Sequence, residues 1–131
     1  MNDTKIKLII AGSRSVQNPE VMQEVAYRYF PDLHVVSLYY EIVNGCASRG
    51  VDLLARQWAS EHNVQLRRFP ADWDEHDKAA GPIRNQEMVD YADELVAIWD
   101  GESTGTRDVF EKALECGLDV HVYQYQGSEN E

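Results

Sequence analysis

The sequence has few cysteines, few prolines, no long apolar run and no excess of positive charge. Cys46 and Cys116 are its only two cysteines, and they form no CxxC or other metal-binding spacing. Disulfide-rich scaffolds and cysteine metal sites are therefore not indicated, and reduced thiols favour a reducing compartment. No apolar run reaches the ~20 residues that span a bilayer, and the N-terminal residues carry no signal-peptide pattern. We expect a cytoplasmic protein that does not bind a membrane.

What is present is the composition of a soluble globular protein. Apolar residues make up 44% and charged residues 27% of the 131 residues, which excludes disordered and collagenous chains. This length is typical of one domain with a single core. We expect one domain over residues 1–123, followed by a flexible acidic tail over residues 124–131.

The charge balance separates two classes of ligand. Twelve basic and 23 acidic residues give a net charge of −11, which repels a long polyanion and weakens the counterion-release contribution to nucleic-acid binding. A small anion can still bind where arginines and backbone N–H groups cluster locally. The charge therefore favours a small phosphorylated ligand over long DNA or RNA.

Apolar patterns along the chain predict alternating strands and helices. We expect strands at residues 5–11, 41–44, 64–69, 94–99 and 119–123, helices at 19–30, 48–62, 82–91 and 106–116, and a polar loop at 71–81. The segment 35–43 fits either one long strand or a loop before a short strand, and we favour the short strand. This order predicts an α/β, Rossmann-like fold, with a mainly parallel sheet of about five strands and helices on both faces.

Four turns rich in glycine, arginine or hydroxyl groups follow the first four expected strands. In such sheets ligands bind at the carboxyl ends of the strands, so these turns open on one edge. Glycine allows close backbone approach, arginine and hydroxyl groups donate hydrogen bonds, and helix N-termini favour anions. The expected ligand residues are Gly12, Ser13, Arg14, Gly45, Ser48, Arg49, Gly50, Asp52, Trp73, Lys78, Gly81, Arg84, Asn85, Asp100, Ser103, Thr104, Gly105 and Thr106.

Some of these residues have an alternative structural role. Asp52 either accepts from a ribose hydroxyl or stabilises a helix dipole, and Asp100 either contacts the ligand or forms an ordinary Asp-Gly turn. Trp73 is expected to stack on a base or to cover the pocket. The acidic run 72–77 is interpreted as a solvated loop, so we predict no metal. Neither the Walker pattern nor GxGxxG is present, and no cofactor is predicted.

Several motifs resemble one known family over nearly the whole chain. The YspA-like branch of the SLOG superfamily has similar motifs at Gly12–Arg14, Gly45–Ala55, Phe69–Trp73, Ala80–Met88 and Trp99–Thr106. The superfamily includes the Lonely guy phosphoribohydrolases and the DNA-processing protein A family, and other SLOG domains are thought to sense nucleotides or ADP-ribose derivatives. The resemblance implies a nucleotide pocket in which Gly105, Thr106 and the preceding turn cradle phosphate and Arg84 lies close to the ligand.

The chain departs from the Lonely guy pattern PGGxGTxxE at the glutamate that supports glycosidic cleavage. Val109 occupies that position, and Asp108 and Glu111 are out of register on the helix. The leading hypothesis is therefore a sensor-like module that binds a nucleotide or ADP-ribose derivative. The first alternative is an N-glycosidic hydrolase of nucleoside monophosphates, using Asp100, Asp108 or Glu111 to help water attack.

Two further expectations follow from the superfamily. Single-stranded DNA binding, by analogy with the DNA-processing relative, is a second alternative that the net charge disfavours. Self-association through exposed helix faces fits the superfamily, but the sequence leaves the oligomeric state open. Cys46 stands at a position in the second loop that is usually glycine in the family.

Overall fold

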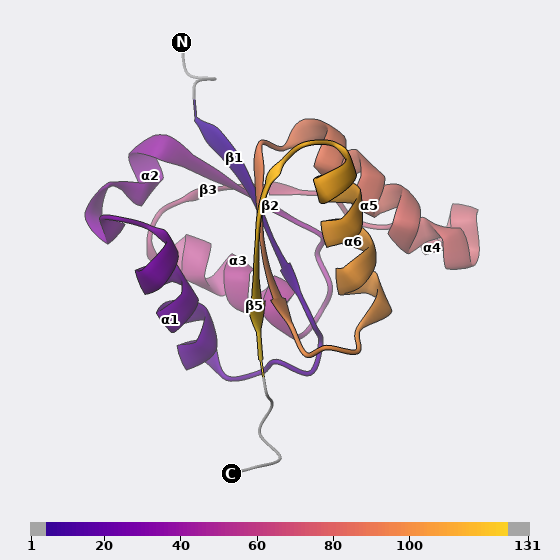
Figure 1. Cartoon of the computed structure of the whole chain (residues 1–131), viewed down its shortest axis with the longest axis horizontal. Helices are drawn as coiled ribbons and strands as arrows, with labels where there is room; N and C mark the ends of the chain where they lie inside the picture. Colours follow the sequence, from indigo (N-terminus) through magenta and orange to yellow (C-terminus); the bar gives the residue numbers. More distant parts are fainter. Residues whose placement is uncertain (1–4, 126–131) are drawn as a thin grey trace.

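A five-stranded parallel sheet forms the centre of the molecule (Figure 1). The computed structural model describes residues 5–125. The sheet has the strand order β3-β2-β1-β4-β5, and every neighbouring pair is parallel. The strands are β1 (Ile6–Gly12), β2 (Tyr40–Asn44), β3 (Gln65–Arg68), β4 (Glu94–Trp99) and β5 (Asp119–Gln124). The expected α/β Rossmann-like fold is confirmed.

Helices cover both faces of this sheet. They are α1 (Pro19–Tyr29), η2 (Leu33–Val35), α2 (Val36–Tyr39), α3 (Val51–Glu61), α4 (Trp73–His76), η3 (Asp77–Ala79), α5 (Ala80–Tyr91) and α6 (Thr104–Glu115). The helices α1 and α3 pack on one face, and α5 and α6 pack on the other (Figure 1). Strand β1 is buried on both sides: Leu8 and Ile10 face the first pair of helices, and Ile9 and Ala11 face the second. Burial on both faces explains why this strand reads as a continuous apolar run.

The strand order places a ligand crevice at one point of the sheet. From β1 the chain winds outward through β2 to β3, and it then crosses over to β4 and winds the other way to β5. The direction of winding changes between β1 and β4. In open α/β sheets the carboxyl ends of the strands at such a reversal form the usual binding crevice.

The expected loop at residues 71–81 is wrong in part, because it contains α4, η3 and the first two residues of α5. The Asp72 carboxylate accepts from the backbone N–H of Glu75 at 3.1 Å and caps α4. Helix α5 begins at Ala80, which is completely buried, and not at Pro82. Proline is tolerated throughout a first helical turn because the N–H groups there have no intrahelical acceptor.

Two other helix starts also differ from the expected ones. The helix expected at 48–62 begins at Val51, because Gly50 has a φ of 77° and cannot continue a helix. The helix expected at 106–116 begins two residues earlier, at Thr104, because Ser103 caps it.

The segment 35–43 and the end of the last strand are also now defined. Two short helices precede β2, which begins at Tyr40, so the short-strand interpretation of this segment is confirmed. Strand β5 extends through Gln124, where the tail was expected to begin. The other tail residues from 126 onward lie outside the described residues.

Within the described part of the chain, no helix has both the length and the apolar character needed to cross a bilayer.

Candidate functional site

A cleft of about 740 Å³ lies at the carboxyl edge of the sheet. It is lined by residues at or after the ends of β1, β2 and β4, by residues of α3, α4, η3 and α5, and by the first two turns of α6. Most of the residues expected to bind the ligand line it: Gly12, Arg14, Gly45, Asp52, Trp73, Lys78, Gly81, Arg84, Asn85, Asp100, Ser103, Thr104, Gly105 and Thr106. The four loops that the sequence placed on one rim therefore do converge in space.

Four expected ligand residues are not among the lining residues: Ser13, Ser48, Arg49 and Gly50. Ser13 is buried, its N–H donates to the Ile98 carbonyl at 3.0 Å, and its hydroxyl accepts from the Asp100 N–H at 3.0 Å. A Cβ on Gly50 would lie 2.4 Å from the Cα of Arg14. Ser13 therefore joins the first loop to the end of β4, and Gly50 packs the second loop against the first.

Arg84 on α5 is held by backbone carbonyls of the neighbouring loops. Its Nη1 donates to the carbonyls of Gly45 and, at 3.4 Å, Phe69, and its Nε donates to Oδ1 of Asn85 at 3.0 Å. Burial lowers the pKa of Arg84, but a guanidinium stays protonated in proteins. Nη2 has no acceptor among residues 5–125, where every buried polar side-chain atom has a partner. We therefore place Nη2 in contact with cleft solvent.

Gly45 is required where Arg84 and Asp52 approach each other. An added Cβ there would lie 2.7 Å from Nη1 of Arg84 and 3.1 Å from Oδ2 of Asp52. The Asp52 carboxylate accepts from the N–H of Ala47 at 3.0 Å through Oδ2. Burial raises the pKa of Asp52, and the Ala47 hydrogen bond and the nearby positive charge of Arg84 only partly counter this. Asp52 therefore combines a buried carboxyl with a free Oδ1, which no described residue hydrogen-bonds.

Cys46 follows Gly45 and has a φ of 68°. This value lies in the left-handed region that favours glycine, which fits the family resemblance, where this position is usually glycine. Its N–H donates to Oδ1 of Asn44 at 2.9 Å, which supports the turn. The second loop therefore takes a left-handed backbone conformation at a residue that is not glycine.

The N-terminus of α6 forms another wall of the cleft. The Ser103 hydroxyl accepts from the N–H of Thr106 at 3.3 Å and lies 3.0 Å from its Oγ1. The N–H groups of Thr104 and Gly105 have no acceptor among the described residues, as is usual in a first helical turn. Apart from its chain neighbours and the backbone of its own helix, no heavy atom lies within 4 Å of the position of a Cβ on Gly105. This helix end is open to an anion.

Asp100 organises the loop that precedes α6. Its Oδ1 accepts from the N–H groups of Glu102 at 2.9 Å and Ser103 at 2.8 Å, and its Oδ2 accepts from the Ser15 hydroxyl at 2.8 Å. Partial burial raises the pKa of Asp100, but these hydrogen bonds outweigh it, so the pKa is lowered. Ser15 also lines the cleft and was missed, although it belongs to the same turn as Arg14.

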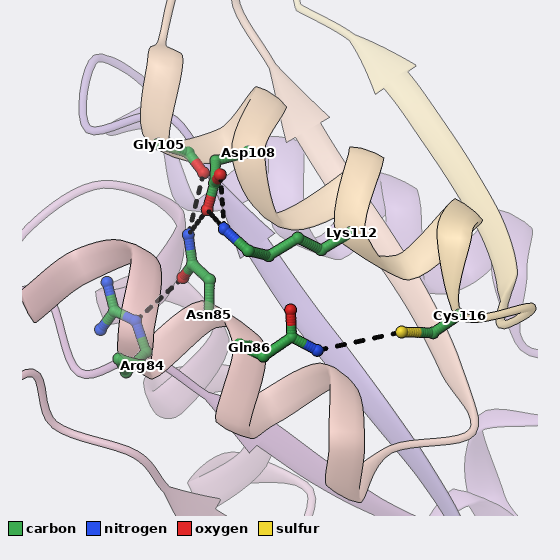
Figure 2. Close-up of polar contacts among 7 residues, drawn as sticks. All are labelled: Arg84, Asn85, Gln86, Gly105, Asp108, Lys112 and Cys116. Atoms are coloured by element: carbon green, nitrogen blue, oxygen red, sulfur yellow. Dashed lines mark hydrogen bonds and ion pairs between the residues drawn. The ribbon is translucent and has the colours of Figure 1, made fainter. Parts of the chain in front are cut away.

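The two other expected catalytic carboxylates are held in ion pairs. Asp108 lines the cleft, but it accepts from Nζ of Lys112 at 2.6 and 2.7 Å and from Nδ2 of Asn85 at 2.9 Å (Figure 2). Glu111 is not among the lining residues and pairs with Arg107 at 3.0 Å on the exposed side of α6. Val109, at the position of the Lonely guy glutamate, is buried against the cleft.

The outer margin of the cleft carries Trp73 and Lys78. Trp73 is the first residue of α4, and 53% of it is exposed. Its ring lies 3.6 Å from the position of a Cβ on Gly81, which places the indole beside the first turn of α5.

Within residues 5–125, no group of three or more His, Cys, Asp or Glu side chains is arranged to hold a metal ion.

Two comparisons with known proteins bear on the family of this chain. The chain is 33% identical over 120 residues to the Gene 61 protein of Mycobacterium phage D29, a match that covers 87% of this chain and 93% of the phage protein. A sequence model of the family described as YspA, cpYpsA-related SLOG matches residues 6–76. This range contains the first three strands, the loops that carry Arg14 and Gly45, and Asp52 in the first turn of α3. The chain therefore belongs to the YspA, cpYpsA-related SLOG family.

Proposed function

We propose that the cleft binds a nucleotide or an ADP-ribose derivative through its phosphate. One observation carries this proposal: Nη2 of Arg84 and the N–H groups of Thr104 and Gly105 come from two different helices and have no acceptor among the described residues. Guanidinium N–H groups and an open helix N-terminus both bind phosphate readily in proteins. Arg14 and Lys78 add positive charge to the same cleft.

The rest of the cleft suits the nucleoside part of such a ligand. Its volume of about 740 Å³ lies within the usual range for small-molecule sites. The free Oδ1 of Asp52 is an acceptor for a ribose hydroxyl, and the exposed indole of Trp73 offers a flat apolar surface on which a base stacks. Asp52 would contact the ribose and Trp73 the base, while Arg84 and the N-terminus of α6 would contact the phosphate.

The carboxylates of the cleft favour binding without cleavage. A general base must be free to accept a proton near the reacting bond. Asp100 accepts several hydrogen bonds and has a lowered pKa, Asp108 is paired with Lys112, and Glu111 is not among the lining residues. We therefore propose a sensor-like module in preference to a phosphoribohydrolase.

Thermal melting with AMP, ADP-ribose and adenosine tests this proposal. Ligand that binds only the folded state stabilises it by RT ln(1 + [L]/Kd), about 2.7 kcal/mol at roughly 100 times Kd. We expect AMP or ADP-ribose to raise the Tm and adenosine to have a much smaller effect. Chromatography of the same samples is expected to show no free adenine. Release of adenine would support the hydrolase instead.

The variants Arg84→Ala and Arg49→Ala locate the binding site. Both remove one arginine from the loops that the sequence singled out, but only Arg84 lines the cleft. We expect Arg84→Ala to lose the ligand-induced rise in Tm and Arg49→Ala to keep it. A rise that survives in Arg84→Ala would mean that the ligand binds elsewhere.

A further inference from the structure

Asn85 joins the two helices that carry the phosphate donors. It is 5% exposed, and its Oδ1 accepts from Nε of Arg84 at 3.0 Å. Its Nδ2 donates to Oδ2 of Asp108 at 2.9 Å and to the carbonyl of Gly105 at 3.3 Å (Figure 2). Both partners of Nδ2 lie in the first turns of α6. One amide therefore bridges α5 and α6 at the cleft.

The surroundings of Asn85 accept only one orientation of its amide. Nδ2 faces a carbonyl and a carboxylate, which are both acceptors, and Oδ1 faces a guanidinium, which only donates. A flipped amide would place oxygen against two acceptors and N–H groups against a donor. Because both of its N–H groups are used on α6, Asn85 has none left for a ligand, although it lines the cleft.

This arrangement holds the guanidinium of Arg84 in one orientation, with only Nη2 free to donate to a ligand. Asn85 holds Nε, the carbonyls of Gly45 and Phe69 hold Nη1, and only Nη2 is free of described acceptors. The same asparagine fixes Gly105, whose N–H is one of the open donors of α6. Donors held in place before binding lose less conformational entropy when the ligand arrives.

Lys112 makes this bridge compatible with an anionic ligand. A carboxylate near the first turn of α6 would repel a phosphate bound there. Nζ of Lys112 lies 2.6 and 2.7 Å from the two oxygens of Asp108, and the side chains of the pair are only 22% and 33% exposed. Lys112 therefore offsets the charge while Asp108 still anchors Asn85.

We propose that Asn85 is a positioning residue, which aligns the free edge of Arg84 with the N-terminus of α6 so that the two bind one phosphate together. The inference rests on the proposed function and names a residue that acts on the ligand through others. It predicts that removing the bridge weakens phosphate binding even though Arg84 and α6 are still present.

Asn85→Ala tests the inference, with Gln86→Ala as its matched control. Gln86 is the next residue of α5, also carries an amide and also reaches α6, but at Cys116, at the end of the helix remote from the cleft (Figure 2). Isothermal titration with AMP is expected to show an affinity lower by about tenfold or more in Asn85→Ala. Gln86→Ala is expected to bind AMP like the wild type. Equal AMP affinity in the two variants would overturn the inference.

A ligand-free measurement separates positioning from general damage. The Arg84 Nε–H signal in ¹⁵N NMR, assigned from its absence in Arg84→Lys, reports the hydrogen bond to Asn85. We expect slow solvent exchange of this proton in the wild type and in Gln86→Ala, and fast exchange in Asn85→Ala. In Asn85→Ala, which removes the acceptor of Nε, weakened AMP binding with an unchanged Nε–H signal would overturn the inference, because Asn85 would then act by another route.

Asn85→Asp keeps the experiment decisive if the alanine variant does not fold. The aspartate retains an acceptor for Nε of Arg84 but turns a second acceptor toward Asp108 and the Gly105 carbonyl. We expect a retained Nε–H signal and weaker AMP binding, and unchanged AMP binding would overturn the inference. A wild type that binds no AMP would instead overturn the proposed function, and the Nε–H comparison would still decide whether Asn85 holds Arg84.

Discussion

At the residue scale, the cleft contains two aspartates whose surroundings shift their pKa values in opposite directions. Burial raises the pKa of Asp52, and the one backbone hydrogen bond that its carboxylate accepts only partly counters this rise. Asp100 is also penalised by partial burial, but the N–H groups of Glu102 and Ser103 and the serine hydroxyls outweigh this penalty and lower its pKa. Asp52 is therefore suited to meet a ligand hydroxyl, whereas Asp100 holds a loop.

The opposite pKa shifts predict opposite effects of two similar substitutions. A raised folded-state pKa means that stability falls as the pH rises from the ordinary aspartate value of 3.8 through the folded value. A lowered folded-state pKa contributes stability above 3.8, and this is lost as the pH falls through the folded value. At about pH 7 we expect Asp52→Asn to raise the Tm and Asp100→Asn to lower it.

Melting curves measured from acidic to neutral pH check this prediction. Both differences from the wild type are expected to shrink under acidic conditions, where the carboxyl groups of the folded and unfolded states are protonated alike. A change of Tm in the same direction for both variants at neutral pH would contradict the assignment.

At the element scale, α6 has both a structural cap and an open end. Ser103 satisfies the N–H of Thr106, while the N–H groups of Thr104 and Gly105 remain available. Helix α1 has a comparable cap, in which Oδ1 of Asn18 accepts from the N–H of Glu20 at 3.0 Å, but Asn18 is not among the residues lining the cleft. The two caps therefore allow stability and binding to be separated.

We predict that Ser103→Ala and Asn18→Ala each cost about 1 kcal/mol of unfolding free energy, the usual loss for an N-cap. Only Ser103→Ala is expected to weaken AMP binding, because it loosens the turn that presents the open N–H groups. Urea unfolding and isothermal titration measure the two effects. Equal AMP affinity in both variants would argue against α6 as the phosphate site.

At the scale of the whole molecule, the chain has a net charge of −11, but its cleft is lined by the basic residues Arg14, Lys78 and Arg84. A small anion meets mainly the local groups, because distant charges are screened within about 10 Å at moderate salt. A polynucleotide extends beyond the cleft and meets the rest of a chain whose net charge is −11. We therefore expect the protein to bind small phosphate compounds and not polynucleotides.

We predict that a single-stranded oligonucleotide of about 20 nucleotides is not retarded by the protein in a gel, even at low salt, where electrostatic binding is strongest. AMP is expected to bind under the same conditions. The measurement is a gel shift across a salt series, compared with AMP titration. Retardation that weakens steeply as salt increases would instead favour the DNA-binding alternative.

Local patterns explain which elements could be predicted. The apolar run of β1 and the apolar stripe of α3 depend on neighbouring residues, so their type and approximate place follow from the sequence. The short helices at 73–79 were missed because four or three residues carry no periodicity. The start of α5 was misplaced because Pro82 suggests a first helical position, while the burial of Ala80 extends the helix.

The order of apolar and polar residues was enough to predict the alternation of strands and helices and the edge of the sheet where glycine, hydroxyl and arginine groups gather, and the composition was enough to disfavour long nucleic acids. Which of these groups share a cleft depends on how the loops pack: Arg14 and Arg84 line it, but Arg49 does not. The tertiary structure also decided that Asp108 is paired and that Asn85 faces inward. The physical reason is that these contacts join loops and helices distant in the chain, so they depend on packing that no local pattern encodes.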